Sequence, residues 1–162
     1  MKGDSTVGSS RGRRSVEIAT EGVRAPRGLD RLAAFCGKAL REAGYSAWEV
    51  SILLCGDDSI TALNRRYRRR PEATDVLSFP EEEGRKGDPV AGDIAISLDA
   101  LRRNAAQFEV LPNEEMKRLL VHGLLHLAGM NHGTGRGGAM LVLQEKLLEA
   151  LRSDLIYGRK RK

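Results

Sequence analysis

All three histidines of this 162-residue chain fall within one segment of eleven residues, from His122 to His132. The segment has the spacing HxxxHxxGxxH, and leucine, valine and alanine residues surround its first two histidines. This pattern predicts a helix that is apolar nearly all round and therefore buried. Two buried imidazoles without partners would cost on the order of a few kcal/mol, so the fold has to provide something that satisfies both rings.

A shared metal ion is the partner that this spacing favours. Residues four apart on a helix differ by about 40° of rotation and about 6 Å of rise, so His122 and His126 can converge on one point. Gly129 can end the helix in a left-handed turn, which lets His132 approach the same point. Three neutral nitrogens around an open position are the ligand set of a catalytic zinc. We therefore expect one zinc ion per chain, while a set of histidines satisfied within the core is the competing interpretation.

The residue after the first histidine separates two kinds of metal enzyme. In zincin proteases this residue is the glutamate that acts as general base. Here it is Gly123, so the predicted helix is zincin-like in its ligands but lacks the proton acceptor of a protease.

The rest of the chain predicts an α+β fold, a single small domain in which a mixed four-stranded sheet packs against helices. Alternating apolar residues predict strands at 15–20, 48–55, 75–79 and 93–98. Helical spacing predicts helices at 28–43, from 57 or 58 to about 67, at 99–108, from 112 to Gly129, and at 139–156. Asp57 or Asp58 is the expected cap of the second helix, and Asp99 that of the third.

The net charge of +5 is unevenly distributed. Residues 1–14 carry +3, residues 64–70 carry +5 and residues 159–162 carry +4, which leaves −7 for the remainder. We expect a disordered basic N-terminal arm at 1–14, a folded domain at 15–157 and a basic tail at 158–162.

Composition narrows the possible classes of protein. No apolar run approaches the roughly 20 residues of a membrane helix, and the first residues lack the apolar stretch of a signal peptide. We therefore expect a cytoplasmic protein without a membrane partner. Cys36 and Cys55 stand alone in apolar segments, which predicts small buried residues that stay reduced.

Three ordered motifs resemble those of the YbeY family of bacterial rRNA maturation factors. The histidine segment is similar to the family's HGxLHLxGxDH. Residues 63–68 read LNRRYR and are similar to LNxxYR, residues 74–80 read TDVLSFP, and residues 92–94 look like the opening of a family strand. The resemblance runs from about residue 15 to residue 152.

This resemblance implies a single-strand-specific, metal-dependent endoribonuclease that acts in 3′-end maturation of small-subunit (16S) rRNA and in ribosome quality control. It implies zinc held by His122, His126 and His132, and a functionally important arginine at Arg68. The implied partners are single-stranded RNA, the small-subunit rRNA, the ribosome and ribosome-associated proteins.

The chain departs from the family pattern at three places. Asn131 stands where the family has aspartate, so a charge beside the third histidine is lost. Residues 133–138 read GTGRGG where the family often has acidic residues, and residues 71–73 read PEA in place of the more usual aspartate-x-proline.

Independently of the family, a metal ion with three protein ligands can lower the pKa of a bound water to around 7. A guanidinium can stabilise two phosphate oxygens at once, and Arg68 is the candidate for this role. Contacts to the RNA backbone are expected from nearby arginines, for which a solvated charged face is the alternative: Arg65, Arg66, Arg69 and Arg70. Ser78 and Asp93 are weaker site candidates that can equally orient the backbone.

Two other functions remain open at this stage. A non-catalytic RNA- or ribosome-binding factor would keep the metal ion only for structure, and Asn131 favours this alternative. A zinc metalloprotease is disfavoured by Gly123.

Overall fold

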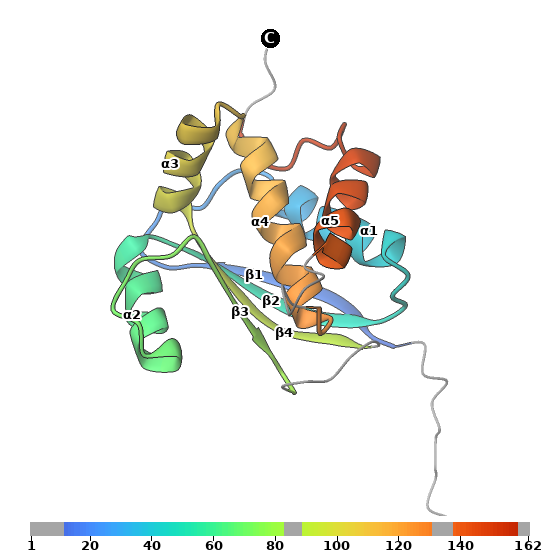
Figure 1. The fold of residues 1–162 in the computed structure, drawn as a ribbon, viewed down its shortest axis with the longest axis horizontal. Coiled ribbons are helices and arrows are strands. Elements are labelled where there is room, and N and C mark those ends of the chain that lie inside the picture. The colour runs from blue at the N-terminus through green and yellow to red at the C-terminus, as the bar shows by residue number, and fades with distance from the viewer. Residues whose placement is uncertain (1–11, 83–88, 131–137, 159–162) are drawn as a thin grey trace, which may run out of the picture.

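The computed structural model describes residues 12–82, 89–130 and 138–158. These residues form four strands and five helices (Figure 1). The strands are β1 (Arg14–Thr20), β2 (Trp48–Cys55), β3 (Val76–Pro80) and β4 (Val90–Ser97). The helices are α1 (Leu29–Glu42), α2 (Asp57–Arg68), α3 (Leu98–Phe108), α4 (Pro112–Leu127) and α5 (Gly138–Ala150).

The strands form one mixed sheet in the order β1-β2-β4-β3. Strand β2 pairs in parallel with both β1 and β4, whereas β3 pairs with β4 in the antiparallel direction. Strand β3 is therefore an edge strand. The predicted α+β fold with a mixed four-stranded sheet is confirmed, although β4 begins at Val90 and not at Asp93.

Each face of the sheet has its own hydrophobic cluster. Helices α1, α4 and α5 lie on one side of the sheet (Figure 1), where α4 packs against β3 and β4. Helix α2 packs against the other face, where Ile60 contributes to a second cluster with Leu77 and Ala95. Three helices thus cover one face of the sheet, and α2 alone packs against the other.

The helix caps differ from the predicted ones. Gly56 is the N-cap of α2, and the side chain of Asp57 instead accepts hydrogen bonds from Ser97 and Arg103. Helix α3 is capped by Ser97, whose hydroxyl accepts a hydrogen bond from the backbone of Ala100. Asp99 accepts from the backbone N–H of Asp57 and so caps the neighbouring helix α2. The predicted caps were wrong because tertiary neighbours compete for these carboxylates.

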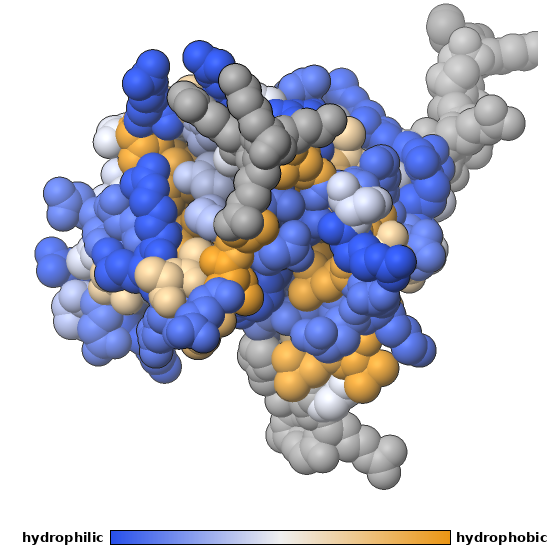
Figure 2. Space-filling model, turned by 90° about the horizontal axis from the view of Figure 1, so that it is seen from above, coloured by the Kyte–Doolittle hydropathy of each residue, from blue (hydrophilic) through white to orange (hydrophobic). Residues whose placement is uncertain are grey.

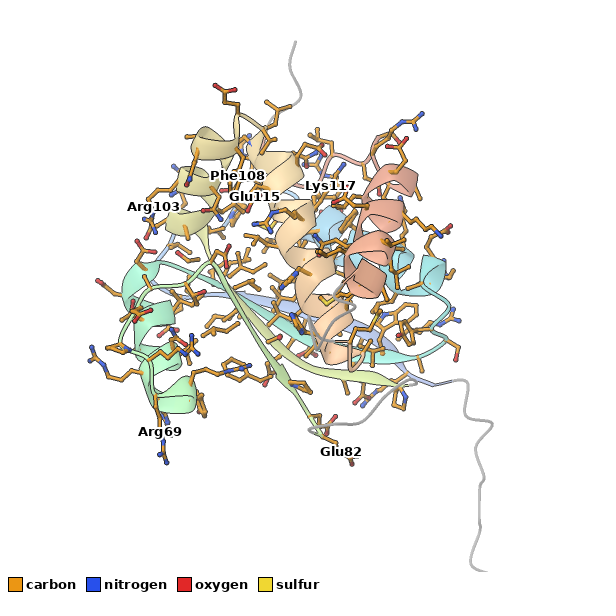
Figure 3. All side chains as sticks on the ribbon, viewed as in Figure 1. Arg69, Glu82, Arg103, Phe108, Glu115 and Lys117 are labelled. Carbon is orange, nitrogen blue, oxygen red and sulfur yellow. The ribbon has the colours of Figure 1, made fainter. Side chains whose placement is uncertain are left out.

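Helix α5 ends at Ala150, before the predicted end at residue 156. The fully buried ammonium of Lys117 donates to the carbonyl oxygens of Leu151 and Arg152, at 3.1 and 3.0 Å. Lys117 lies on the part of α4 that faces α5 (Figure 3). Carbonyl groups at the end of a helix lack partners within the helix, and Lys117 supplies them here. The helix can therefore end at Ala150 even though the apolar pattern of the sequence continues further.

The surface and the core follow from this layering. The face seen in Figure 2 is mainly hydrophilic, with hydrophobic residues in a few separate patches. Cys36 and Cys55 are buried and free, as predicted. No helix among the described residues is both long and apolar enough to cross a membrane. Most of the predicted basic arm and tail lie outside the described residues.

Candidate metal centre and RNA cleft

His122 and His126 lie one turn apart on α4, and both side chains are partly exposed on a helix whose other faces are mostly buried. Their Nε2 atoms are 3.1 Å apart, and the ring centroids are 4.6 Å apart in an edge-on arrangement. The predicted convergence of these two imidazoles is therefore present.

The second nitrogen of His122 faces another helix. Nδ1 of His122 lies 3.1 Å from Oε1 of Gln144, which comes from α5 and is only 4% exposed. The sequence prediction missed Gln144. The available signal was its position four residues after Met140 and three before Leu147, on the apolar face of α5.

Gly123 lies between α4 and the sheet. A Cβ atom added at Gly123 would lie 3.0 Å from Cδ1 and 3.2 Å from Cγ2 of Ile94 in β4. Ile94 is buried, so a glutamate at position 123 would overlap the core. The packing of α4 against Ile94 therefore leaves no room at this position for the glutamate that acts as general base in zincins.

The two histidines open into a cavity of about 530 Å³ beside the edge strand β3. Its wall combines residues from α2, from the loop that follows, from β3 and from α4: Asn64, Arg68, Arg70, Glu72, Ala73, Thr74, Val76, Leu77, Ser78, His122, Gly123 and His126. Two of the predicted arginines, one weaker candidate and two predicted metal ligands therefore share one cavity.

Arg68 is the last residue of α2 and lines this cavity. Its guanidinium donates to the carbonyl oxygen of Ser78 at 2.7 Å and lies 5.7 Å from the ring centroid of Phe79. These contacts fix the side chain against the exposed edge of β3. Asn64 holds the next part of the wall, because its amide donates to the carbonyl oxygen of Glu72 at 2.8 Å.

The remaining predicted residues lie elsewhere. Arg65, Arg66 and Arg69 are exposed and do not line this cavity. Arg69 points away from the domain at the end of α2 (Figure 3). Asp93 lines a separate groove on the other face of the sheet, so the structure does not bring it to the histidines.

A polar network fixes the start of β3, and the sequence prediction did not foresee it. Asn104 donates to the carboxylates of Asp75 and Glu115, at 3.0 and 3.1 Å. Arg118 donates to Glu115 at 2.8 Å, and this hydrogen bond raises the pKa of the guanidinium. Glu115 is buried, so the network ties α3, α4 and the TDVLSFP segment together behind the cavity wall.

The third predicted ligand, His132, and its neighbour Asn131 lie outside the described residues. Among the residues that are described, no group of three histidine, cysteine or carboxylate side chains could hold a metal ion.

The described pair of histidines nevertheless fits zinc. Two zinc–nitrogen bonds of about 2.0–2.1 Å that meet at a near-tetrahedral angle keep their nitrogens about 3.3 Å apart. The observed separation of 3.1 Å between the two Nε2 atoms is close to this value. A carbonyl-type oxygen at Nδ1 of His122 is also the usual partner of a metal-binding imidazole.

These features define the class of protein: a small α+β domain in which paired histidines and arginines line one cavity at the edge of a mixed sheet. A family model described as "Endoribonuclease YbeY" matches residues 23–152. The chain belongs to the YbeY endoribonuclease family, and the resemblance in its motifs is confirmed.

Curated relatives agree with this assignment. The chain is 43% identical over 129 residues to the endoribonuclease YbeY of Treponema denticola, covering 76% of this chain and 83% of that relative. It is 41% identical over 140 residues to the endoribonuclease YbeY of Treponema pallidum, covering 82% and 87%. Family membership supports an RNA-cleaving hydrolase with RNA as its substrate.

A solved structure has the same fold. The solution structure of TM1509 from Thermotoga maritima matches with a TM-score of 0.61 and 27% sequence identity. The match covers 86% of this chain and 93% of that chain, so it includes nearly the whole of the solved structure.

Proposed function

We propose that this protein is a zinc-dependent endoribonuclease that cleaves single-stranded RNA in the cavity beside β3. The observation that carries the proposal is the pair of Nε2 atoms 3.1 Å apart in the same cavity as Arg68 and Arg70, in a chain of the YbeY family. Its expected place of action, maturation of the 3′ end of small-subunit rRNA and ribosome quality control, rests on the family resemblance.

His122 and His126 would hold the ion together with His132. When bound, zinc supplies a Lewis acid that activates water at neutral pH. The chain's own contribution is to direct two imidazole nitrogens toward one point, which lies at the wall of the cavity. Gly123 lets α4 lie close enough to the sheet for this, because a larger residue would push the helix away from Ile94.

Arg68 and Arg70 would bind the phosphodiester. Negative charge builds up on the phosphate oxygens during cleavage, and the guanidinium groups of residues that already line the cavity would stabilise that charge. The bond from Arg68 to the carbonyl of Ser78 uses only part of its five donors, so the others remain for the phosphate.

The proposal is tested by metal analysis together with cleavage of a labelled single-stranded RNA, with and without chelator. We expect about one zinc per chain in the wild type and loss of cleavage on chelation, with recovery when zinc is added. His126→Ala should lose zinc and cleavage together. Cleavage at the wild-type rate by a zinc-free His126→Ala protein would refute the role of the metal.

The same experiment separates the two alternatives. A non-catalytic binding factor would bind zinc and RNA but leave the RNA intact. A metalloprotease would digest an unfolded protein such as casein in a zinc-dependent way, which the packing of Gly123 against Ile94 argues against.

A further inference from the structure

We infer that Gln144 is a positioning residue for the proposed metal centre: its side-chain oxygen holds the proton of His122 on Nδ1 and thereby leaves the lone pair of the ring on Nε2, the atom that would bind a metal ion. The inference deepens the proposed function and rests on it for the identity of the ion. It assigns a role to a residue outside the histidine segment, on a different helix.

The two ring nitrogens of His122 have different neighbours and different roles. A neutral imidazole carries one proton, and only the nitrogen without it has a lone pair for a metal ion. Oε1 of Gln144 is an acceptor and lies 3.1 Å from Nδ1 of His122. The proton is therefore favoured on Nδ1, and the lone pair is left on Nε2, the atom that faces His126.

The opposite arrangement would weaken metal binding. With its proton on Nε2, His122 would direct an N–H toward Nε2 of His126, only 3.1 Å away. The two rings would then satisfy each other by a hydrogen bond, and the point between them would offer one lone pair fewer. An acceptor at Nδ1 disfavours this competing state.

Gln144 is held firmly enough for such a role. It is 4% exposed, and the segment just after α5 is fixed to α4 by the bonds from Lys117 to the carbonyls of Leu151 and Arg152. The neighbouring buried residues Met140 and Leu147 lie on the same face of α5. A buried amide on this face would cost stability without a partner, and His122 is the partner that it has.

The test compares zinc affinity among variants of the full chain. Gln144→Met keeps the size of the side chain and removes the acceptor, whereas Gln144→Glu retains an acceptor at the same reach. Glu145→Gln is the matched control, because Glu145 is exposed on the same helix and lines no part of the histidine cavity. Dissociation constants are measured by competition with a chromophoric chelator, without RNA.

We expect Gln144→Met to weaken zinc binding by roughly 10- to 100-fold, the usual effect of removing such a partner. Gln144→Glu should bind zinc at least as tightly as the wild type, and Glu145→Gln should stay within about twofold of it. Wild-type affinity in Gln144→Met, at an unchanged fraction of folded protein, would overturn the inference.

A second measurement uses only the wild-type chain and does not depend on zinc. Long-range ¹H–¹⁵N correlation spectra of the metal-free protein report which ring nitrogen of His122 carries the proton. We expect the Nδ1–H form, and a predominant Nε2–H form would contradict the role of Gln144. If the chain bound no zinc at all, the proposed function would fail while this spectrum still decided the state of His122.

Discussion

At the residue scale, the two cysteine thiols give a prediction with a definite sign. Burial raises the pKa of Cys36 from 9.0 to about 12 and that of Cys55 to about 11. The unfolded chain therefore loses these protons first as the pH rises above 9. The stabilisation is complete below pH 9 and declines above it, at up to about 1.4 kcal/mol per pH unit for each thiol.

The free energy of unfolding in urea, measured from pH 7 to pH 10.5, checks this expectation. Cys36→Ala should be less stable than the wild type at pH 7 and should lose stability less steeply above pH 9. Parallel curves for the two proteins would show that Cys36 does not contribute to the alkaline loss. Thiol-specific reagents should also label the native chain far more slowly than the unfolded one.

Arg68 gives a second prediction at this scale. Arg68→Ala should lower the rate of single-stranded RNA cleavage by roughly 10²-fold, as expected for loss of one preorganised donor to a developing oxyanion. Zinc content should not change, because Arg68 contacts Ser78 and Phe79 and not the histidines. Arg41→Ala, an exposed change on α1, serves as the control. An Arg68→Ala enzyme with full activity would show that the phosphate is held by other residues.

At the scale of elements, the distance between α4 and β4 is set by Gly123. Gly123→Ala should gain about 1 kcal/mol of helix propensity but lose more through overlap with the buried side chain of Ile94. In an Ile94→Ala background the overlap is gone, so the same change should become stabilising. Urea unfolding of the four proteins in a double-mutant cycle measures this reversal. Additive effects would mean that the helix shifts to accommodate the methyl group.

Elements with a local signal were predictable from the sequence, and those shaped by distant partners were not. Strand β2 was placed correctly at both ends, because the buried residues Val50, Ile52 and Leu54 alternate with more exposed ones at positions 49, 51 and 53. The end of α5 was misplaced because it depends on Lys117, which is more than thirty residues away in sequence. The caps of α2 and α3 were also mispredicted, because the carboxylates of Asp57 and Asp99 bind partners that are distant in sequence.

In the candidate site, too, the features with a local sequence signal were predictable and those that depend on distant partners were not. The convergence of His122 and His126 follows from their spacing on one helix, and it was predicted. Gln144 was missed because a single amide in a leucine-rich helix shows no partner until α5 packs against α4. Arg68, His132 and the bound metal remain predictions, supported by the resemblance of the motifs and by the shared cavity in which Arg68 lies.

At the scale of the whole molecule, the exposed arginines at the end of α2 lie beside the histidine cavity. Arg70 lines the cavity itself, while Arg65, Arg66 and Arg69 extend the positive charge outside it. We expect an RNA strand bound in the cavity to contact this charge as well. Contacts to phosphates release counterions, so their number appears in the salt dependence of binding.

Neutralising the arginines near the end of α2, which are Arg65, Arg66, Arg69 and Arg70, tests whether they contact RNA phosphates. Changing all four arginines to glutamine should reduce the slope of log K against log salt by roughly 3, because each phosphate contact to a single strand contributes about 0.7. The control carries the same change in net charge at a separate groove that shares no residue with the histidine cavity: Arg24, Arg27, Arg31 and Arg102. Because local contacts and not net charge release the counterions, the control should keep most of the wild-type slope. An equal loss of slope in both proteins would mean that RNA binding responds to the overall charge of the chain. The arginines at the end of α2 would then have no special role in binding RNA at the histidine cavity.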